Sequence, residues 1–369
     1  MIVLLSLSHM ALQLSQPRVG LVLGAGGVLG GAWIAGGLAA ITRNTGWDPF
    51  NATHVVGTSA GAIFAALTAA RVPTERLVPA RLAPMAGTVA PNEWLLDELA
   101  AEASYMPRGV PRPLPGSIGL AVKGLRYRSG ISLLKAISGL APMGQVSTAP
   151  IARCIQRGLP KRGRGGWVAH PNCWIVACDY QSGERVVFGR QGSPAAEIGQ
   201  AAAASCAIPG FFRPVQIGGR LYVDGGLHSM SNADLLEEEE LDLVVILNPL
   251  SARVGRRTWN PVDRVASTIR RLAAWQLDRE VGRLLDRGTH VLVLEPTVDD
   301  LDAMGGNVMD ARRSIDVAEV AMGTFSEQLA RPEVSELCEM LPRTAASRRR
   351  AGRLGALLRR AGVAAAAAF

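Results

Sequence analysis

The chain has 369 residues, of which 48% are hydrophobic and 19% are charged, and its formal net charge is +8. This composition excludes a globally disordered chain, because it supplies enough apolar surface for one large core or two modest ones. Only 5% of the residues are aromatic, so the sequence offers no platforms for base stacking, and we expect no nucleic-acid partner.

The cysteines and the first residues of the chain indicate a reducing compartment. The five cysteines are odd in number, form no Cys-x-x-Cys pair and have no histidine nearby at metal-ligand spacing. We therefore expect reduced, buried thiols and no metal site. The apolar start has no Lys or Arg before it and no clear cleavage site, which argues against a secretory signal. We expect a cytoplasmic protein, with peripheral membrane contact as an option.

The first part of the chain alternates between predicted strands and helices. Arg18–Gly24 and Thr53–Val56 are short apolar runs typical of buried strands. The pattern predicts helices after them at Ala32–Thr42 and Ala60–Ala70. Two successive strand–loop–helix units favour a parallel sheet covered by helices.

One stretch of this region also resembles a membrane span. Val19–Thr42 carries no charge and is long enough to cross a bilayer. It contains eight glycines, however, and glycine weakens a helix. We therefore favour a strand followed by a tight glycine turn over a membrane span.

The middle of the chain predicts an insertion, after which strand signals return. From Val72 to about Gln145 the alternation of strands and helices is less regular, around a Pro/Gly-rich stretch. This insertion could be a lid or a surface loop, and the sequence does not decide between them. The later predicted elements are strands at Cys173–Tyr180 and Glu184–Gly189, a helix at Pro194–Ser205, a hairpin at Arg213–Gly226, strands at Leu241–Pro249 and His290–Pro296, and a long helix at Pro261–Asp286.

These elements predict an α/β fold with three layers, in which helices cover both faces of a mostly parallel central sheet. We divide the chain into an N-terminal extension (1–17), for which disorder is one interpretation, a folded domain (18–330) carrying the insertion (72–145), and a basic tail (331–369). The arginine-rich tail is either solvated or a helix that contacts an anionic membrane.

"HVVGTSAGAI" places Ser59 between Gly57 and Gly61, after a predicted strand and before a predicted helix. In this context a Gly-x-Ser-x-Gly pattern indicates a nucleophile on a sharp turn. The helix N-terminus favours developing negative charge near the serine oxygen. The structural alternative is a serine that only caps the helix.

The glycine-rich loop Gly24–Gly30 allows two interpretations. A dinucleotide-binding loop also has glycines after a first strand, but the spacing here is imperfect and the nearest acid, Asp48, precedes the second strand. The alternative is an oxyanion hole, whose backbone N–H groups stabilise a tetrahedral intermediate. Because both glycine loops follow strand ends, they should share one edge of a parallel sheet, which favours the oxyanion hole.

Two groups could remove the proton of a reactive Ser59. A Ser-His-Asp triad needs a histidine later in the chain, and His228 and His290 are the candidates. Alternatively, Asp224 in "YVDGG" acts directly, because an acid at the end of an apolar run is costly unless it is paired or used. An aspartate that caps its own turn is the structural alternative.

Three segments, in this order, resemble the patatin-like phospholipases, also described as the patatin and cytosolic phospholipase A2 group of lipid acyl hydrolases: "LGAGGVLGGAW", "GTSAGAI" and "VDGG". The resemblance continues through "AAAASCAIPGFFRPVQIGGRLYVDGG", "SNADLL", "LVVILNP" and "NVMDARRS", so it covers roughly residues 18–330.

The resemblance implies a Ser–Asp dyad without histidine and without a cofactor, with Ser59 as nucleophile and Asp224 as base. The backbone N–H groups of Gly26, Gly27 and Val28 would form the oxyanion hole. The supporting glycines of the motifs are Gly24, Gly30, Gly57, Gly61, Gly225 and Gly226.

Two positions depart from the family's pattern. Leu29 stands where the glycine loop of the family has Arg or Lys, and Ala25 stands at its first motif glycine. Loss of the cation puts a contact with an anionic head group in doubt.

The resemblance implies a serine hydrolase of fatty acyl esters, whether phospholipid, lysophospholipid or neutral lipid. The alternatives are a lipid-binding protein without activity, a Ser-His-Asp esterase and a nucleotide-dependent enzyme.

Overall fold

The computed structural model describes residues 16–79, 82, 115–126, 138–159, 164–254 and 261–342. The start of the predicted N-terminal extension, most of the predicted insertion and the basic tail from residue 343 lie outside the described residues. Two interpretations therefore stay predictions: that the insertion is a lid, and that the tail contacts a membrane.

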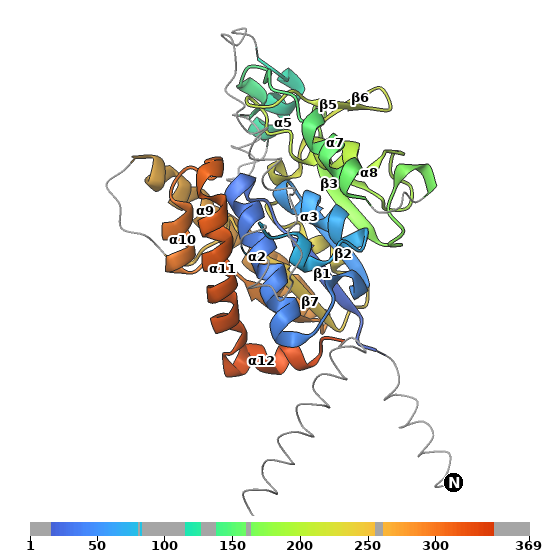
Figure 1. Cartoon of the computed structure of the whole chain (residues 1–369). Helices are drawn as coiled ribbons and strands as arrows, with labels where there is room; N and C mark the ends of the chain where they lie inside the picture. Colours follow the sequence, from blue (N-terminus) through green and yellow to red (C-terminus); the bar gives the residue numbers. More distant parts are fainter. Residues whose placement is uncertain are drawn as a thin grey trace, which may run out of the picture.

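The described chain contains one mixed sheet in which most neighbouring strands are parallel (Figure 1). Its strands are β1 (Val19–Leu23), β2 (His54–Thr58), β3 (Cys173–Asp179), β4 (Arg185–Phe188), β5 (Val215–Ile217), β6 (Arg220–Asp224), β7 (Leu243–Leu247) and β8 (His290–Leu294). The main order is β5-β6-β3-β2-β1-β7-β8, with β4 paired to β3. The neighbouring strands β3, β2, β1, β7 and β8 pair in parallel, in that spatial order. Strands β4, β5 and β6 make antiparallel pairs.

Helices cover both faces of this sheet, which confirms the predicted three-layer α/β architecture. One apolar core joins the sheet to α2 (Gly27–Thr45), α3 (Ala60–Ala69), α8 (Ile198–Ser205) and α11 (Ser314–Leu329). A second core, on the other face, joins it to α9 (Pro261–Asp286). The remaining described α-helices are α5 (Ile118–Arg126), α7 (Ala149–Gly158), α10 (Val298–Met304) and α12 (Pro332–Glu339).

Helix α2 begins at Gly27, inside the stretch for which the sequence predicts a loop, so that prediction was wrong. Farther along α2, two glycines allow close helix packing. A Cβ at Gly36 would lie 2.4 Å from the carbonyl oxygen of Ala318, and a Cβ at Gly37 would lie 2.4 Å from the ring of Phe325, both on α11. The close contact with α11 offsets the low helix propensity of these two glycines. No helix among the described residues is long and apolar enough to span a membrane.

Candidate active site

The strand register brings the two candidate catalytic residues to the same level of the sheet. Strand β3 lies between β2 and β6, with Thr58 paired to Val176 and Asp224 paired to Ala177. Neighbouring strands are about 4.8 Å apart, so the backbones of Ser59 and Asp224 flank β3 at a separation of about 10 Å. Their side chains span this gap, and the Ser59 hydroxyl lies close enough to the Asp224 carboxylate to lower its pKa by hydrogen bonding.

The serine stands in a strained turn between β2 and α3. Ser59 has φ 54° and ψ −123°, a region that residues with a Cβ rarely adopt and that surrounding contacts must hold. It occupies the N-cap position of α3, yet its side chain makes no capping hydrogen bond. The interpretation as a capping serine is therefore wrong.

The flanking glycines allow the close approach that this turn requires. A Cβ at Gly61 would lie 2.0 Å from the carbonyl oxygen of Leu23, and a Cβ at Gly57 would lie 2.6 Å from the Cβ of Ala65. At Gly61 the obstacle is backbone, which cannot rotate away as a side chain could. The turn can therefore form only if position 61 lacks a side chain.

Replacing Gly61 by Ala is expected to destabilise the protein by about 3 kcal/mol, because the new methyl group must displace the backbone of β1. Urea unfolding of the purified variant measures this change. The matched control is Gly282→Ala in α9, where nothing lies within 4 Å of the added Cβ. There, the higher helix propensity of alanine should leave stability equal or raise it by up to about 1 kcal/mol. Equal stabilities of the two variants would contradict the steric account.

The aspartate is a buried carboxylate with few hydrogen-bond donors. Asp224 ends β6 and is 6% exposed. Its Oδ1 accepts a hydrogen bond of 2.7 Å from the backbone N–H of Gly226, as expected for an aspartate that caps its own turn. Burial raises its pKa to about 6, while the N–H of Gly226 and the hydroxyl of Ser59 act in the opposite direction. At pH 7 to 8 the carboxylate is therefore mostly ionised and can accept a proton.

The glycine loop lies beside the serine and presents unpaired N–H groups. Gly27 and Val28 form the first turn of α2 and line the same pocket as Ser59. The N–H groups of Gly26, Gly27 and Val28 have no acceptor among the described residues, whereas the N–H of Leu29 donates to the carbonyl oxygen of Val308 at 2.9 Å. Free N–H groups at a helix N-terminus can stabilise an oxyanion.

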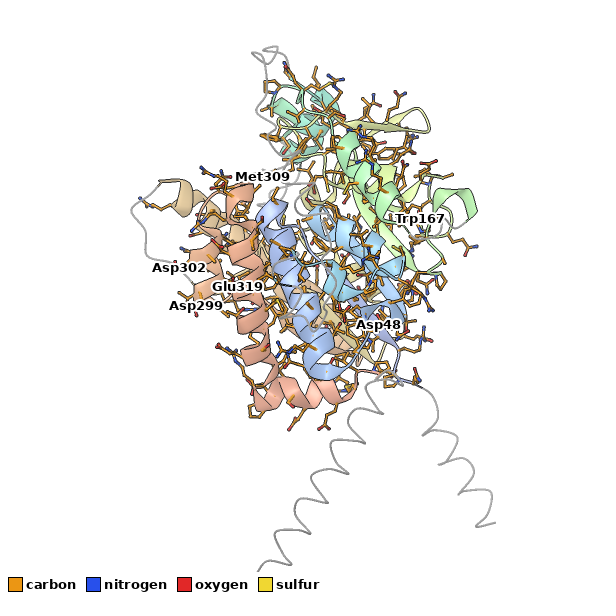
Figure 2. The ribbon with its side chains drawn as sticks, viewed as in Figure 1. Asp48, Trp167, Asp299, Asp302, Met309 and Glu319 are labelled. Atoms are coloured by element: carbon orange, nitrogen blue, oxygen red, sulfur yellow. The ribbon has the colours of Figure 1, made fainter. Side chains whose placement is uncertain are left out.

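The pocket in front of Ser59 is almost entirely apolar. It encloses about 670 Å³ of empty space, including open solvent at its mouth. Met309 is among the residues that line it and lies beside the first turn of α2 (Figure 2). The other apolar side chains on its wall include Ile63, Phe64, Ile151, Ile208 and Phe212. A pocket of this kind suits a hydrocarbon chain and offers it no ionic partner.

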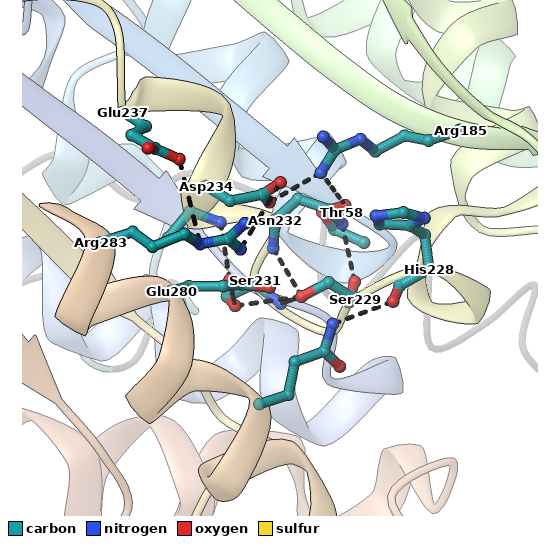
Figure 3. A network of polar contacts seen from close by, with 12 residues as sticks. Thr58, Arg185, His228, Ser229, Ser231, Asn232, Asp234, Glu237, Glu280 and Arg283 are labelled. Atoms are coloured by element: carbon teal, nitrogen blue, oxygen red, sulfur yellow. Dashed lines mark hydrogen bonds and ion pairs between the residues drawn. The ribbon is translucent and has the colours of Figure 1, made fainter. Parts of the chain in front are cut away.

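Neither candidate histidine lines this pocket. His290 opens β8 and therefore lies at the amino-terminal edge of the parallel strands, opposite the edge that carries Ser59. The alternative triad through His290 is therefore wrong. His228 lies in a polar network near Asp234 (Figure 3). Burial raises the pKa of Asp234, but Arg185 and then His228 lower it, and the net shift is downward.

The dinucleotide interpretation fails for a similar reason. Asp48 caps the short helix η1 (Pro49–Asn51), accepting a 3.0 Å hydrogen bond from the N–H of Phe50. It lies beyond the C-terminal end of α2, far from the glycine loop at the other end (Figure 2). Among the described residues, no cluster of three or more His, Cys, Asp or Glu side chains could hold a metal ion.

A buried polar network beneath the serine turn was not predicted from the sequence (Figure 3). Asn232, at φ 56°, donates hydrogen bonds from Nδ2 to the hydroxyl oxygen of Thr58 at 3.0 Å and to the carbonyl oxygen of Ser229 at 2.7 Å. Thr58 immediately precedes Ser59, and Ser229 lies in the loop after Asp224. The side-chain amide of Asn232 therefore links, through hydrogen bonds, the segment that carries Ser59 to the segment that follows Asp224.

The other half of this network is anchored on α9. The buried carboxylate of Glu280 accepts hydrogen bonds from the hydroxyl of Ser231 at 2.5 Å and from the N–H of Ala233 at 3.0 Å. Burial, followed by the nearby charge of Asp234, raises the pKa of Glu280. Arg185 pairs with Asp234 at 2.7 Å at the edge of the network. These bonds fix the loop that follows β6.

The fold and the site together define a class: an α/β protein whose strand-to-helix turn presents a serine to a buried carboxylate. The chain belongs to the patatin-like phospholipase family, whose model matches residues 21–237, more than half of the chain. Proteins of that family are lipid acyl hydrolases. Among solved structures, the chain is similar to VipD from Legionella pneumophila, with 15% identity, a TM-score of 0.35, and coverage of 83% of this chain and 67% of that chain.

Proposed function

We propose that this protein is a serine acyl hydrolase that cleaves fatty acyl esters through a Ser59–Asp224 dyad. The observation that carries the proposal is the proximity of the Ser59 hydroxyl, which lines an apolar pocket, to the buried Asp224 carboxylate. A hydroxyl is a weak nucleophile unless a neighbouring base takes its proton, and Asp224 is the titratable group in contact with it.

In the first half-reaction, Asp224 takes the proton from Ser59 Oγ as the oxygen attacks the ester carbonyl carbon. The resulting oxyanion accepts hydrogen bonds from the N–H groups of Gly26, Gly27 and Val28. When the tetrahedral intermediate collapses, the bond to the alcohol oxygen breaks and the alcohol leaves with the proton held by Asp224. The product is an acyl-enzyme on Ser59.

In the second half-reaction, Asp224 takes a proton from water as the water oxygen attacks the acyl carbon. Collapse of this intermediate breaks the bond to Ser59 Oγ, which recovers the proton from Asp224. The fatty acid is released and the enzyme returns to its starting state.

The pocket supports a fatty acyl group as the recognised part of the substrate. Its apolar side chains, with Ile208 and Phe212 near Ser59, can bury a hydrocarbon chain. Leu29 stands where the family has a basic residue, and its side chain is fully buried in the core. That position therefore supplies no cation to a phosphate head group, and neutral lipids join phospholipids and lysophospholipids as candidate substrates.

Release of free fatty acid from a lipid panel tests this function. The panel contains a p-nitrophenyl butyrate, a long-chain p-nitrophenyl ester, phosphatidylcholine, lysophosphatidylcholine and a triacylglycerol, each incubated with the wild type and with Ser59→Ala. We expect release by the wild type and none above background by the variant. Tight binding of these lipids without release by either protein would instead identify a lipid-binding protein.

A further inference from the structure

Ser205, at the C-terminal end of α8, holds the backbone of the candidate nucleophile. The Ser59 N–H donates a 2.8 Å hydrogen bond to Ser205 Oγ, and this hydroxyl in turn donates a 2.6 Å hydrogen bond to the carbonyl oxygen of Val176 on β3. Ser205 is fully buried, so water cannot replace it as a partner for either group. Its hydroxyl therefore links the serine turn directly to the strand between Ser59 and Asp224.

The same short segment also holds the candidate base. Two residues after Ser205, the carbonyl oxygen of Ala207 accepts a 3.0 Å hydrogen bond from the backbone N–H of Asp224. The residue after Asp224 lies against β3 as well, since a Cβ at Gly225 would lie 2.4 Å from the carbonyl oxygen of Val176. Residues 205–207 thus contact both members of the pair, one on each side of β3.

We propose that Ser205 is a positioning residue that sets the Ser59 hydroxyl at hydrogen-bond distance from Asp224. The proposal rests on the proposed function, because it assigns a role within the same site. Ser59 occupies a strained backbone conformation, which persists only where its surroundings hold it. Without the Ser205 hydroxyl, rotation of the 58–59 peptide would relieve this strain and carry Ser59 Oγ away from the carboxylate.

The bond has a second consequence for the chemistry. Because the Ser59 N–H is already paired with Ser205, it is not free to bind the oxyanion. The N–H groups of the glycine loop at the start of α2 lack acceptors among the described residues and can supply donors in its place. The N–H of Ser59 therefore positions the nucleophile, and other N–H groups bind the developing charge.

The test compares Ser205→Ala with Ser117→Ala, a matched control. Ser117 is also buried, and its hydroxyl likewise accepts from a backbone N–H, that of Leu120, and donates to a backbone carbonyl, that of Tyr180. Ser117 does not line the pocket of Ser59. Both variants lose the same two kinds of hydrogen bond, so a purely structural role predicts similar effects in both.

We expect Ser205→Ala to lower kcat for a soluble p-nitrophenyl ester, and the rate constant for labelling of Ser59 by a fluorophosphonate, about 10- to 100-fold. KM should stay within about twofold, because the acyl pocket is unchanged. Ser205→Thr, which keeps the hydroxyl, should recover part of both rates. Ser117→Ala should keep wild-type values of kcat and of the labelling rate constant. Equal rates in Ser205→Ala and Ser117→Ala would overturn the proposal.

Amide hydrogen exchange provides a readout that does not depend on activity. The Ser59 amide should exchange faster in Ser205→Ala than in the wild type, and at the wild-type rate in Ser117→Ala. If the wild type neither hydrolyses esters nor reacts with the probe, the proposed function fails, and the catalytic part of this proposal fails with it. Unchanged exchange at Ser59 in Ser205→Ala would refute the positioning contact itself, whatever the activity of the wild type.

Discussion

Replacing Asp224 by Asn is expected to reduce turnover of a soluble acyl ester about 10³- to 10⁴-fold, because the amide cannot accept the proton of Ser59. Asparagine has nearly the shape of aspartate and its oxygen can still accept the hydrogen bond from Gly226. The loss should therefore fall on kcat, with little change in KM. Steady-state kinetics with p-nitrophenyl butyrate measures both constants.

The two histidine variants provide the controls for this result. His228→Ala and His290→Ala should stay within about threefold of the wild-type kcat, since neither histidine lines the pocket of Ser59. Retained activity in Asp224→Asn together with lost activity in His228→Ala would contradict the dyad and indicate a triad instead.

The same substitution is expected to stabilise the protein at alkaline pH. The pKa of Asp224 is about 6 in the folded protein, against a usual value of 3.8. Folding therefore favours the protonated form, so the carboxylate costs stability wherever it is ionised. This cost is absent below about pH 4, grows as pH rises to about 6, and reaches about 3 kcal/mol above that, since one pKa unit corresponds to about 1.4 kcal/mol.

Asparagine carries no charge and avoids this cost. Asp224→Asn should thus have a free energy of unfolding up to about 3 kcal/mol above that of the wild type at about pH 8, and nearly equal to it at about pH 4. Chemical denaturation of both proteins at these two pH values measures the difference, in which contributions from all other groups cancel. A variant that is less stable than the wild type at pH 8, or a difference independent of pH, would refute the account of Asp224.

The pH dependence of activity should follow the same group. Because Asp224 must be ionised to act as a base, kcat/KM of the wild type should rise with pH and reach half of its plateau near pH 6. The contribution of Asp224 to stability and the activity of the wild type therefore change in opposite directions over this interval. Such opposition is common at sites where function requires a buried charge.

The sequence predicts the sheet and the candidate pair because both depend on local signals. Apolar runs that end in glycine mark strands and the turns after them, and Ser59 and Asp224 each stand at such a strand end. The position of α9 is also predicted, since its apolar residues recur with a helical period over 26 residues. These features need no knowledge of which distant segments meet.

What the sequence does not predict depends on contacts between distant segments. The hydrogen bond from Ser59 to Ser205 joins residues 146 positions apart, and an alanine-rich helix ending in serine carries no local sign of it. Asn232 and Glu280 likewise look like ordinary polar residues of a loop and of an amphipathic helix until the fold buries them beside Thr58 and Ser231.

The start of α2 is another feature that depends on contacts between distant segments. Tandem glycines lower helix propensity, so the sequence favours a loop there. In the fold these first glycines pack closely against distant segments, since a Cβ at Gly27 would lie 3.0 Å from the sulfur of Met309 and a Cβ at Gly30 would lie 3.0 Å from the ring of Pro249. Neither contact can be anticipated from the local sequence pattern, because both join segments far apart in the chain.

The covalent step on Ser59 can be observed directly. Wild type and Asp224→Asn are incubated with a fluorophosphonate probe, and the adduct is located by peptide mass spectrometry. We expect stoichiometric modification of Ser59 in the wild type and slowing by at least about a hundredfold in the variant, because the hydroxyl then lacks its base. Modification of a different residue, or equally fast labelling of Ser59 in both proteins, would contradict the dyad.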